Sequence, residues 1–118
     1  FSKKKPLKDA HPRHTLTVMY SGFVYILRCR DGSYYVGSHR GDDVGMRVAD
    51  HQAGRGGDYT RRRLPVECVY SEWFTLVTDA IAAERRIKGW SRAKKEALIA
   101  GDWDGLQRLA KRRGGEPR

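Results

Sequence analysis

The N-terminal half of the chain contains two runs of aromatic and β-branched residues with the pattern of paired strands. The first run covers Phe23 to Arg30, and the second covers Ser33 to Gly37. Between them, Asp31-Gly32 is a strong hairpin signal, because glycine adopts the positive φ that a tight turn requires. A further run, from Val66 to Trp73, follows Pro65 and predicts a third strand.

Helical spacing of the apolar residues predicts four helices after the hairpin. They cover Val44 to Ala53, Thr78 to about Lys88, Ser91 to Ala100, and a last short segment through Leu109. The intervening residues 54–63 are rich in glycine and arginine and are expected to form a flexible loop. The pattern predicts an α+β fold, with a small, mostly antiparallel three-stranded sheet flanked by helices.

The register of the hairpin decides which tyrosines share a face of the sheet. Side chains alternate along a strand, so a two-residue loop at Asp31-Gly32 would place Tyr25 on the same face as Tyr34. A bulge at Gly32 would instead bring Tyr25 and Tyr35 to one face. We predict the bulge.

The composition indicates a polyanionic partner. The chain has 118 residues, which suits one domain with one modest core. Its 24 Lys and Arg residues against 14 Asp and Glu residues give a formal net charge of +10. Basic groups release condensed counterions when they bind phosphates, so nucleic acid is the leading partner. A membrane surface is a weaker one, because no amphipathic helix is flanked by apolar anchors.

Three segments are expected along the chain. Residues 1–18 are basic and are expected to form a flexible extension upstream of Met19, a natural start. Residues 19–112 would form the domain, and residues 113–118 a flexible tail. Because no apolar run has the length of a membrane span or a secretory signal, a soluble cytoplasmic protein is expected. Cys29 and Cys68 each fall inside a predicted strand and are expected to be reduced core residues.

Two helices carry residue types that suit phosphate chemistry. Arg47 and His51 lie four residues apart on one helical face, so their side chains can converge on one ligand, although a solvated face is the simpler alternative. Glu84 lies on or beside the face of its helix that should pack inward. A buried carboxylate is costly unless it is paired or bound to a metal, and one of the two arginines that follow it could pair with it at the surface.

Taken together, these elements resemble the GIY-YIG nuclease domain, and in particular the small stand-alone members of that family. The resemblance spans about residues 22 to 110. It rests on an ordered series: Val24-Tyr25-Ile26, Tyr35-Val36-Gly37, Arg47, His51, Gly57-Asp58-Tyr59-Thr60 and the segment from Glu84 to Lys95. Phe23, Val24 and Val36 depart from the usual glycine, isoleucine and isoleucine. The chain also lacks the asparagine that some relatives carry beyond the metal-binding glutamate.

The resemblance implies a catalytic set of Tyr25, Tyr35, Arg47, His51 and Glu84. Tyr25 would orient or deprotonate the attacking water, Tyr35 would hydrogen-bond the phosphate or the water, and Arg47 would donate two hydrogen bonds to the scissile phosphate. His51 would accept or relay a proton or bind phosphate, so the general base remains open between Tyr25 and His51. Glu84 would bind a single divalent cation, Mg²⁺ or Mn²⁺, because these ions prefer hard oxygen ligands.

The implied function is a divalent-metal-dependent endonuclease that hydrolyses DNA phosphodiester bonds, on single-stranded or branched DNA. The alternatives are a noncatalytic nucleic-acid-binding module of the same fold and an RNA-directed nuclease. Tyr34, Tyr59 and Trp73, if exposed, could stack on unpaired bases. The sequence indicates no protein partner. Seven residues are expected to contact nucleic acid: Tyr59, Arg61, Arg62, Arg63, Lys88, Lys94 and Lys95.

Overall fold

A three-stranded antiparallel sheet lies at the centre of the computed structural model, which describes residues 19–115. Its strands are β1 (Gly22–Cys29), β2 (Tyr34–Arg40) and β3 (Val66–Phe74), in the order β2-β1-β3. β1 is the central strand, and all its residues from 22 to 27 are buried. The α+β prediction with an antiparallel sheet is therefore confirmed. The predicted extension at residues 1–18 lies outside the described residues.

The β1–β2 hairpin contains the predicted bulge. The Gly32 N–H donates to the Cys29 carbonyl at 2.9 Å, the Cys29 N–H donates to the Ser33 carbonyl at 2.8 Å, and Gly32 has a φ of 87°. This is a three-residue loop with glycine in the left-handed region. Tyr25 therefore faces Gly37 and Leu27 faces Tyr35 in the register, which places the two tyrosines on the same face of the sheet.

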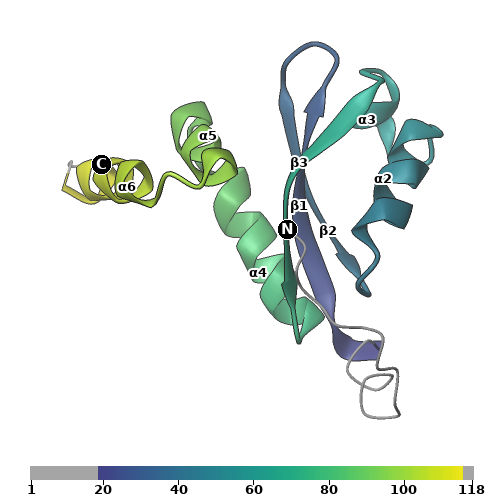
Figure 1. Cartoon of the computed structure of the whole chain (residues 1–118), viewed down its shortest axis with the longest axis horizontal. Coiled ribbons are helices and arrows are strands. Elements are labelled where there is room, and N and C mark those ends of the chain that lie inside the picture. Colours follow the sequence, from purple (N-terminus) through teal and green to yellow (C-terminus); the bar gives the residue numbers. More distant parts are fainter. Residues whose placement is uncertain (1–18, 116–118) are drawn as a thin grey trace.

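Helices cover both faces of the sheet (Figure 1). α4 (Val77–Lys88) lies on one face, and α2 (Val44–Gln52) with the short α3 (Asp58–Arg61) lies on the other. α5 (Arg92–Ala100) follows α4 and contacts the sheet through Leu98, and α6 (Trp103–Gly115) extends away from the sheet. The sheet thus separates two layers, and residues that alternate along its strands reach different helices.

Three sequence predictions need correction. The N-cap of α4 is Leu76 and not Thr78, which lies inside the helix. Residues 54–63 are not a continuous loop, because they contain α3. α6 runs to Gly115, so residues 113–115 belong to a helix, and residues 116–118 lie outside the described range. By contrast, Ser91 caps α5 as predicted, accepting a hydrogen bond from the Lys94 N–H.

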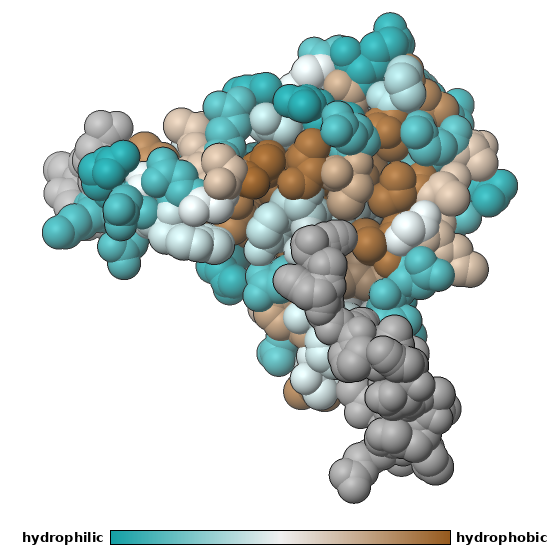
Figure 2. Space-filling model, in the orientation of Figure 1, coloured by the Kyte–Doolittle hydropathy of each residue, from teal (hydrophilic) through white to brown (hydrophobic). Residues whose placement is uncertain are grey.

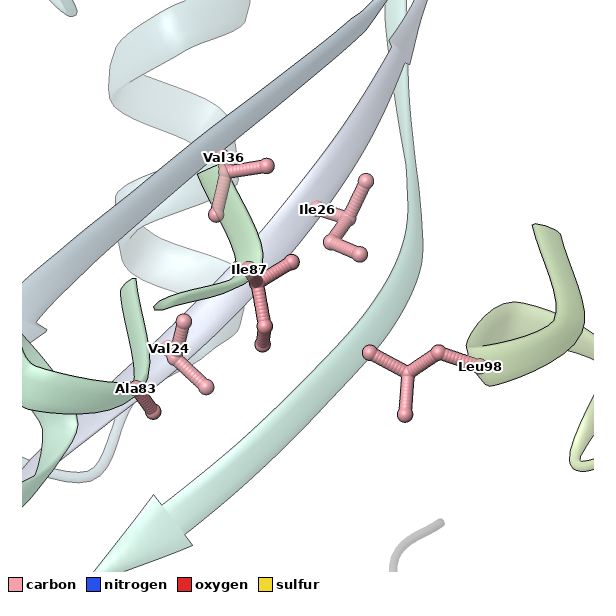
Figure 3. Packing of buried hydrophobic residues seen from close by; sticks show 6 residues of the cluster. All are labelled: Val24, Ile26, Val36, Ala83, Ile87 and Leu98. Carbon is pink, nitrogen blue, oxygen red and sulfur yellow. The ribbon is translucent and has the colours of Figure 1, made fainter. Parts of the chain in front are cut away.

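The two faces of the sheet carry separate hydrophobic clusters. The cluster under α4 joins side chains from β1, β2, α4 and α5 (Figure 3): Val24, Ile26, Val36, Ala83, Ile87 and Leu98. The cluster under α2 consists of Phe23, Tyr25, Leu27, Cys29 and Val66. Cys29 and Cys68 are both free thiols, Cys29 buried and Cys68 half-buried. Tyr25 thus belongs to the core as well as to the predicted site.

Hydrophobic residues gather across the middle of the face shown in Figure 2, and hydrophilic residues surround them and cover α6. The large hydrophobic side chains exposed on the described part of the molecule include Trp73, Leu76 and Trp103. None of the helices between residues 19 and 115 is both long enough and apolar enough to span a bilayer.

Candidate active site

The hydroxyl of Tyr25 is the meeting point of three elements. The Arg47 Nε donates to it at 3.2 Å, and the His51 Nε2 lies 2.8 Å from it. Gly37, the partner of Tyr25 in the register, leaves room for it, because a Cβ at that position would lie 2.7 Å from the tyrosine hydroxyl oxygen. The pKa of Tyr25 is raised to about 12, because the effect of burial is larger than the opposing effect of the hydrogen bond from Arg47. The hydroxyl therefore keeps its proton at neutral pH.

His51 is fully buried between Tyr25 and α3. Its Nδ1 lies 2.7 Å from the Thr60 hydroxyl oxygen, and Gly56 packs so closely that any side chain there would overlap the imidazole. Burial and the positive charge of Arg47 lower the pKa of His51 to about 4. The imidazole is neutral at physiological pH and can act as a hydrogen-bond or proton acceptor.

Helical spacing in α2 brings Arg47 and His51 to one point, as predicted from their separation of four residues. The ligand on which they converge is the Tyr25 hydroxyl, which belongs to the protein itself. The side chain of Arg47 is 21% exposed, and its Nη1 lies 3.7 Å from the Asp50 carboxylate. Burial alone would lower the pKa of Arg47, but the hydrogen bond to Tyr25 and the electrostatic effects of the neighbouring tyrosines and Asp50 together raise it. Tyr25 and His51 are inaccessible, so the guanidinium of Arg47 is the part of this group that a phosphate can reach.

Glu84 approaches the site from the opposite face of the sheet. The Ser38 hydroxyl donates to its Oε1 at 2.5 Å, and the Lys88 Nζ donates to its Oε2 at 2.8 Å. Ser38 alternates with Gly37 along β2, the edge strand, so the carboxylate lies on the α4 side of that strand. Burial works to raise the pKa of Glu84, but the hydrogen bonds from Lys88 and Ser38 outweigh it and hold the pKa below its usual value. Its partner is Lys88 and not an adjacent arginine.

Glu84 fits a divalent cation as a single carboxylate ligand. Among residues 19–115, no group of three or more His, Cys, Asp or Glu side chains is arranged to hold a metal. Mg²⁺ often binds proteins through one carboxylate, with water and substrate phosphate oxygens completing its shell. The ionised carboxylate and the neighbouring Ser38 hydroxyl supply hard oxygen atoms for such a site.

Comparison with known proteins gives a family match. Residues 21–97 match the GIY-YIG catalytic domain. The chain belongs to the GIY-YIG family. Membership implies nuclease-type chemistry on nucleic acid, and nucleases of this family generally use a divalent metal.

Two relatives and one solved structure illustrate the similarity. A UPF0213 protein of Streptococcus pneumoniae is 39% identical over 85 residues, which are 72% of this chain and 84% of that protein. The UPF0213 protein VNG_2274C of Halobacterium salinarum is 49% identical over 76 residues, which are 64% of this chain and 96% of that protein. The UPF0213 protein BH0048 from Bacillus halodurans, known from a solution NMR structure, is 37% identical in sequence. The match covers 75% of this chain and 96% of the BH0048 chain, with a TM-score of 0.45. Their names specify neither substrate nor metal.

The second motif tyrosine of this GIY-YIG domain connects the buried residues to the surface. The ring centroid of Tyr35 lies 5.2 Å from that of His51 and 6.3 Å from that of Tyr25. Tyr59 stacks on Tyr35 with 6.1 Å between centroids, and the Arg63 guanidinium lies 3.8 Å over the Tyr59 ring. The Tyr35 hydroxyl makes no hydrogen bond to another described residue, so it is open to a water molecule or a phosphate oxygen.

Four of the residues predicted to contact nucleic acid form ion pairs within the protein. Arg61 and Arg62 both pair with the exposed Asp58 of α3. Arg63 forms an ion pair with Asp31 of the hairpin at 3.1 Å, and Lys88 pairs with Glu84. These are exposed or partly exposed pairs of low stability, which a phosphate can replace.

Two α5 lysines of the GIY-YIG domain differ in position. Lys95 is half-buried. Lys94 is 8% exposed, and its ammonium lies 4.3 Å over the ring of Trp90. This placement does not support the phosphate contact predicted for Lys94, because its charge faces a neighbouring side chain.

The aromatic residues expected to stack on bases also differ from one another. Arg92 covers the ring of Tyr34, whose hydroxyl donates to Glu96 at 3.2 Å, so Tyr34 holds α5 to the sheet. Tyr59 and Trp73 are each 38% exposed. The ring of Tyr59 is stacked on Tyr35 and covered by Arg63, so the support for base stacking rests on Trp73.

Four residues of the site were not identified from the sequence. Thr60 hydrogen-bonds the imidazole, and Ser38 hydrogen-bonds the carboxylate. Gly37 lets Tyr25 come close to the backbone, and Gly56 does the same for His51. Thr60 lies in the motif run at residues 57–60, which is the one signal that pointed to it. Ser38 follows the second motif directly, but the predicted strand ended one residue before it.

Proposed function

We propose that this protein is a divalent-metal-dependent endonuclease that hydrolyses DNA phosphodiester bonds. The observation that carries the proposal is the hydroxyl of Tyr25, held between Arg47 and His51 beside an edge strand whose other side carries the ionised Glu84. Phosphodiester hydrolysis requires charge stabilisation on the phosphoryl oxygens and an oriented water. A partly exposed guanidinium and a carboxylate that can bind a cation match these requirements.

Arg47 is the residue that we assign to the scissile phosphate. Its Nε is fixed by the Tyr25 hydroxyl, while its Nη1 makes only a long contact with Asp50, at 3.7 Å. A planar guanidinium held in this way can donate hydrogen bonds to a phosphate with little further loss of side-chain entropy. The pKa of Arg47 is raised, so the guanidinium is charged at neutral pH.

Tyr25 is assigned to orientation rather than to removal of a proton. Its side chain is 0% exposed, so water does not reach the hydroxyl in this conformation. The pKa of Tyr25 is raised to about 12 and that of His51 is lowered to about 4, both chiefly by burial, so proton transfer from the phenol to the imidazole is unfavourable. Tyr25 therefore holds Arg47 and His51 in place, and Tyr35, whose hydroxyl is open, contacts the attacking water or a phosphate oxygen.

Glu84, with Ser38 beside it, is assigned to the divalent cation. When bound, the cation supplies Lewis-acid stabilisation of the phosphoryl group and of the leaving oxygen. Ser38 holds one carboxylate oxygen, and the low pKa of Glu84 keeps the ligand ionised. The Lys88 side chain is 56% exposed, so water can solvate its ammonium when a cation takes its place at the carboxylate.

Single-stranded or branched DNA is the substrate form that we propose. Trp73 is partly exposed, and base–aromatic stacking is tolerant of sequence. The net charge of +10 adds affinity for any phosphate backbone. A noncatalytic nucleic-acid-binding module is the second candidate, because the Lys88 ammonium already neutralises the carboxylate on which metal binding depends.

Cleavage assays distinguish these functions. Wild type, Glu84→Gln and the control Glu67→Gln are incubated with labelled single-stranded, duplex and branched DNA and with RNA, in Mg²⁺, Mn²⁺ or EDTA. Glu67 is an exposed strand carboxylate paired with Arg28, so its substitution removes one charge away from the site. We expect cleavage by wild type and Glu67→Gln that requires metal, and none by Glu84→Gln. Binding without cleavage by wild type under every condition would identify a recognition module, and equal cutting by Glu84→Gln would exclude the metal assignment.

A further inference from the structure

Thr60 has a relation to the site that neither the family match nor the sequence motif assigns. Its side chain is 0% exposed, and its hydroxyl lies 2.7 Å from the Nδ1 of His51, which is equally buried. No solvent can replace this hydroxyl as a partner of the ring. The geometry therefore gives Thr60 control over which ring nitrogen of His51 carries the proton.

The hydrogen bonds around Tyr25 indicate which tautomer is present. Arg47 can only donate, so the Tyr25 oxygen accepts from its Nε. The hydroxyl proton of Tyr25 must then be donated to the His51 Nε2, since no other described residue bonds to this hydroxyl. His51 consequently carries its proton on Nδ1 and donates it to the Thr60 oxygen. The reverse tautomer would leave the phenol, a stronger acid than the threonine hydroxyl, without an acceptor in a buried site.

Local backbone structure keeps Thr60 and His51 in place. α3 holds Thr60, and Gly56 lies against the imidazole so closely that a side chain at that position would overlap the ring. The other charged or titratable groups that act on the ring are Arg47 and Asp50 of α2 and His39 of β2. None of these three hydrogen-bonds the Nδ1, which leaves that role to Thr60.

We propose that Thr60 is a positioning residue for the reaction: it accepts the Nδ1 proton of His51, so that Nε2 presents its lone pair to Tyr25 and fixes the hydroxyl that orients Arg47. This inference rests on the proposed nuclease function. Through this series of contacts, the buried threonine determines the orientation of the partly exposed guanidinium. Loss of its hydroxyl should affect turnover more than substrate binding, because the phosphate-binding charges remain present.

The test compares Thr60→Val, which keeps the shape and removes the hydroxyl, with Thr60→Ser, which restores the hydroxyl, and with the exposed control Thr78→Val of α4. Nitrogen-15 NMR of the histidine rings reports the tautomer of His51 directly, with or without catalytic activity. We expect Nδ1-protonated His51 in wild type, Thr60→Ser and Thr78→Val. Thr60→Val should show a substantial share of the Nε2-protonated form.

Cleavage kinetics complete the test. Thr60→Val should lower kcat about tenfold with little change in KM, as expected for one lost hydrogen bond that acts in the transition state. Thr60→Ser should recover most of this loss. An Nε2-protonated His51 in wild type, or an unchanged tautomer in Thr60→Val, would overturn the proposal. If wild type cuts no substrate, the proposed function fails, and the tautomer measurement still decides whether Thr60 controls His51.

Discussion

Acidification should destabilise the protein through His51 in a way that can be measured separately from all other groups. The pKa of this imidazole is about 4 in the folded protein, against an ordinary value of 6.5, because burial and the charge of Arg47 disfavour its protonated form. Below pH 6.5 the unfolded chain binds a proton at this position and the folded chain does not. The stability that this difference provides is complete above pH 6.5, and it is lost as the pH falls from 6.5 through 4.

The size of the effect follows from the two pKa values. Integrating proton binding for one group between about pH 7.5 and about pH 5 gives a loss of about 2 kcal/mol in the free energy of unfolding. This is a large share of the total for a small domain, whose free energy of unfolding is about 5 to 15 kcal/mol. It corresponds to a decrease of about 1 to 2 M in the midpoint of urea denaturation.

Urea denaturation of wild type and His51→Gln at both pH values measures the difference. His51→Gln cannot gain a proton, and all other titratable groups, including His39 with its lowered pKa, are common to the two proteins. We expect the variant to be less stable at the higher pH and to lose about 2 kcal/mol less on acidification. Equal losses in the two proteins would show that His51 is not held neutral by burial, and the assigned hydrogen bonds around Tyr25 would be wrong.

Three further predictions test other parts of the site. Gly37→Ala places a Cβ 2.7 Å from the Tyr25 hydroxyl oxygen, so overpacking should lower the free energy of unfolding by about 1 to 3 kcal/mol in a denaturation experiment. Replacing the three arginines of residues 61–63 by alanine should weaken DNA binding and flatten its salt dependence whatever the sequence, and an unchanged slope in a titration would place the phosphate contacts elsewhere. Lys88→Met should tighten Mn²⁺ binding several-fold in calorimetry, because its ammonium occupies one oxygen of Glu84, and unchanged affinity would argue against competition at this carboxylate.

The sequence alone predicted the parts of the site that depend on local geometry. The four-residue spacing of Arg47 and His51 predicted that their side chains can converge, because helical geometry fixes which residues share a face. Gly32 was enough to predict the bulge, because only glycine takes its backbone conformation easily. The inward position of Glu84 followed from the helical stripe in the same way. These features are decided by residues within a few positions of one another.

Only the tertiary structure decided what these side chains meet. Arg47 and His51 converge on a buried tyrosine from another element, and Glu84 accepts a hydrogen bond from Ser38 of the edge strand. Such contacts depend on packing between segments that are distant in the sequence. The pKa values depend on it too, since burial is the largest influence on Tyr25 and His51 and is a property of the whole fold. The sequence determined which chemical groups were available, and packing determined their partners, their charges and their access to water.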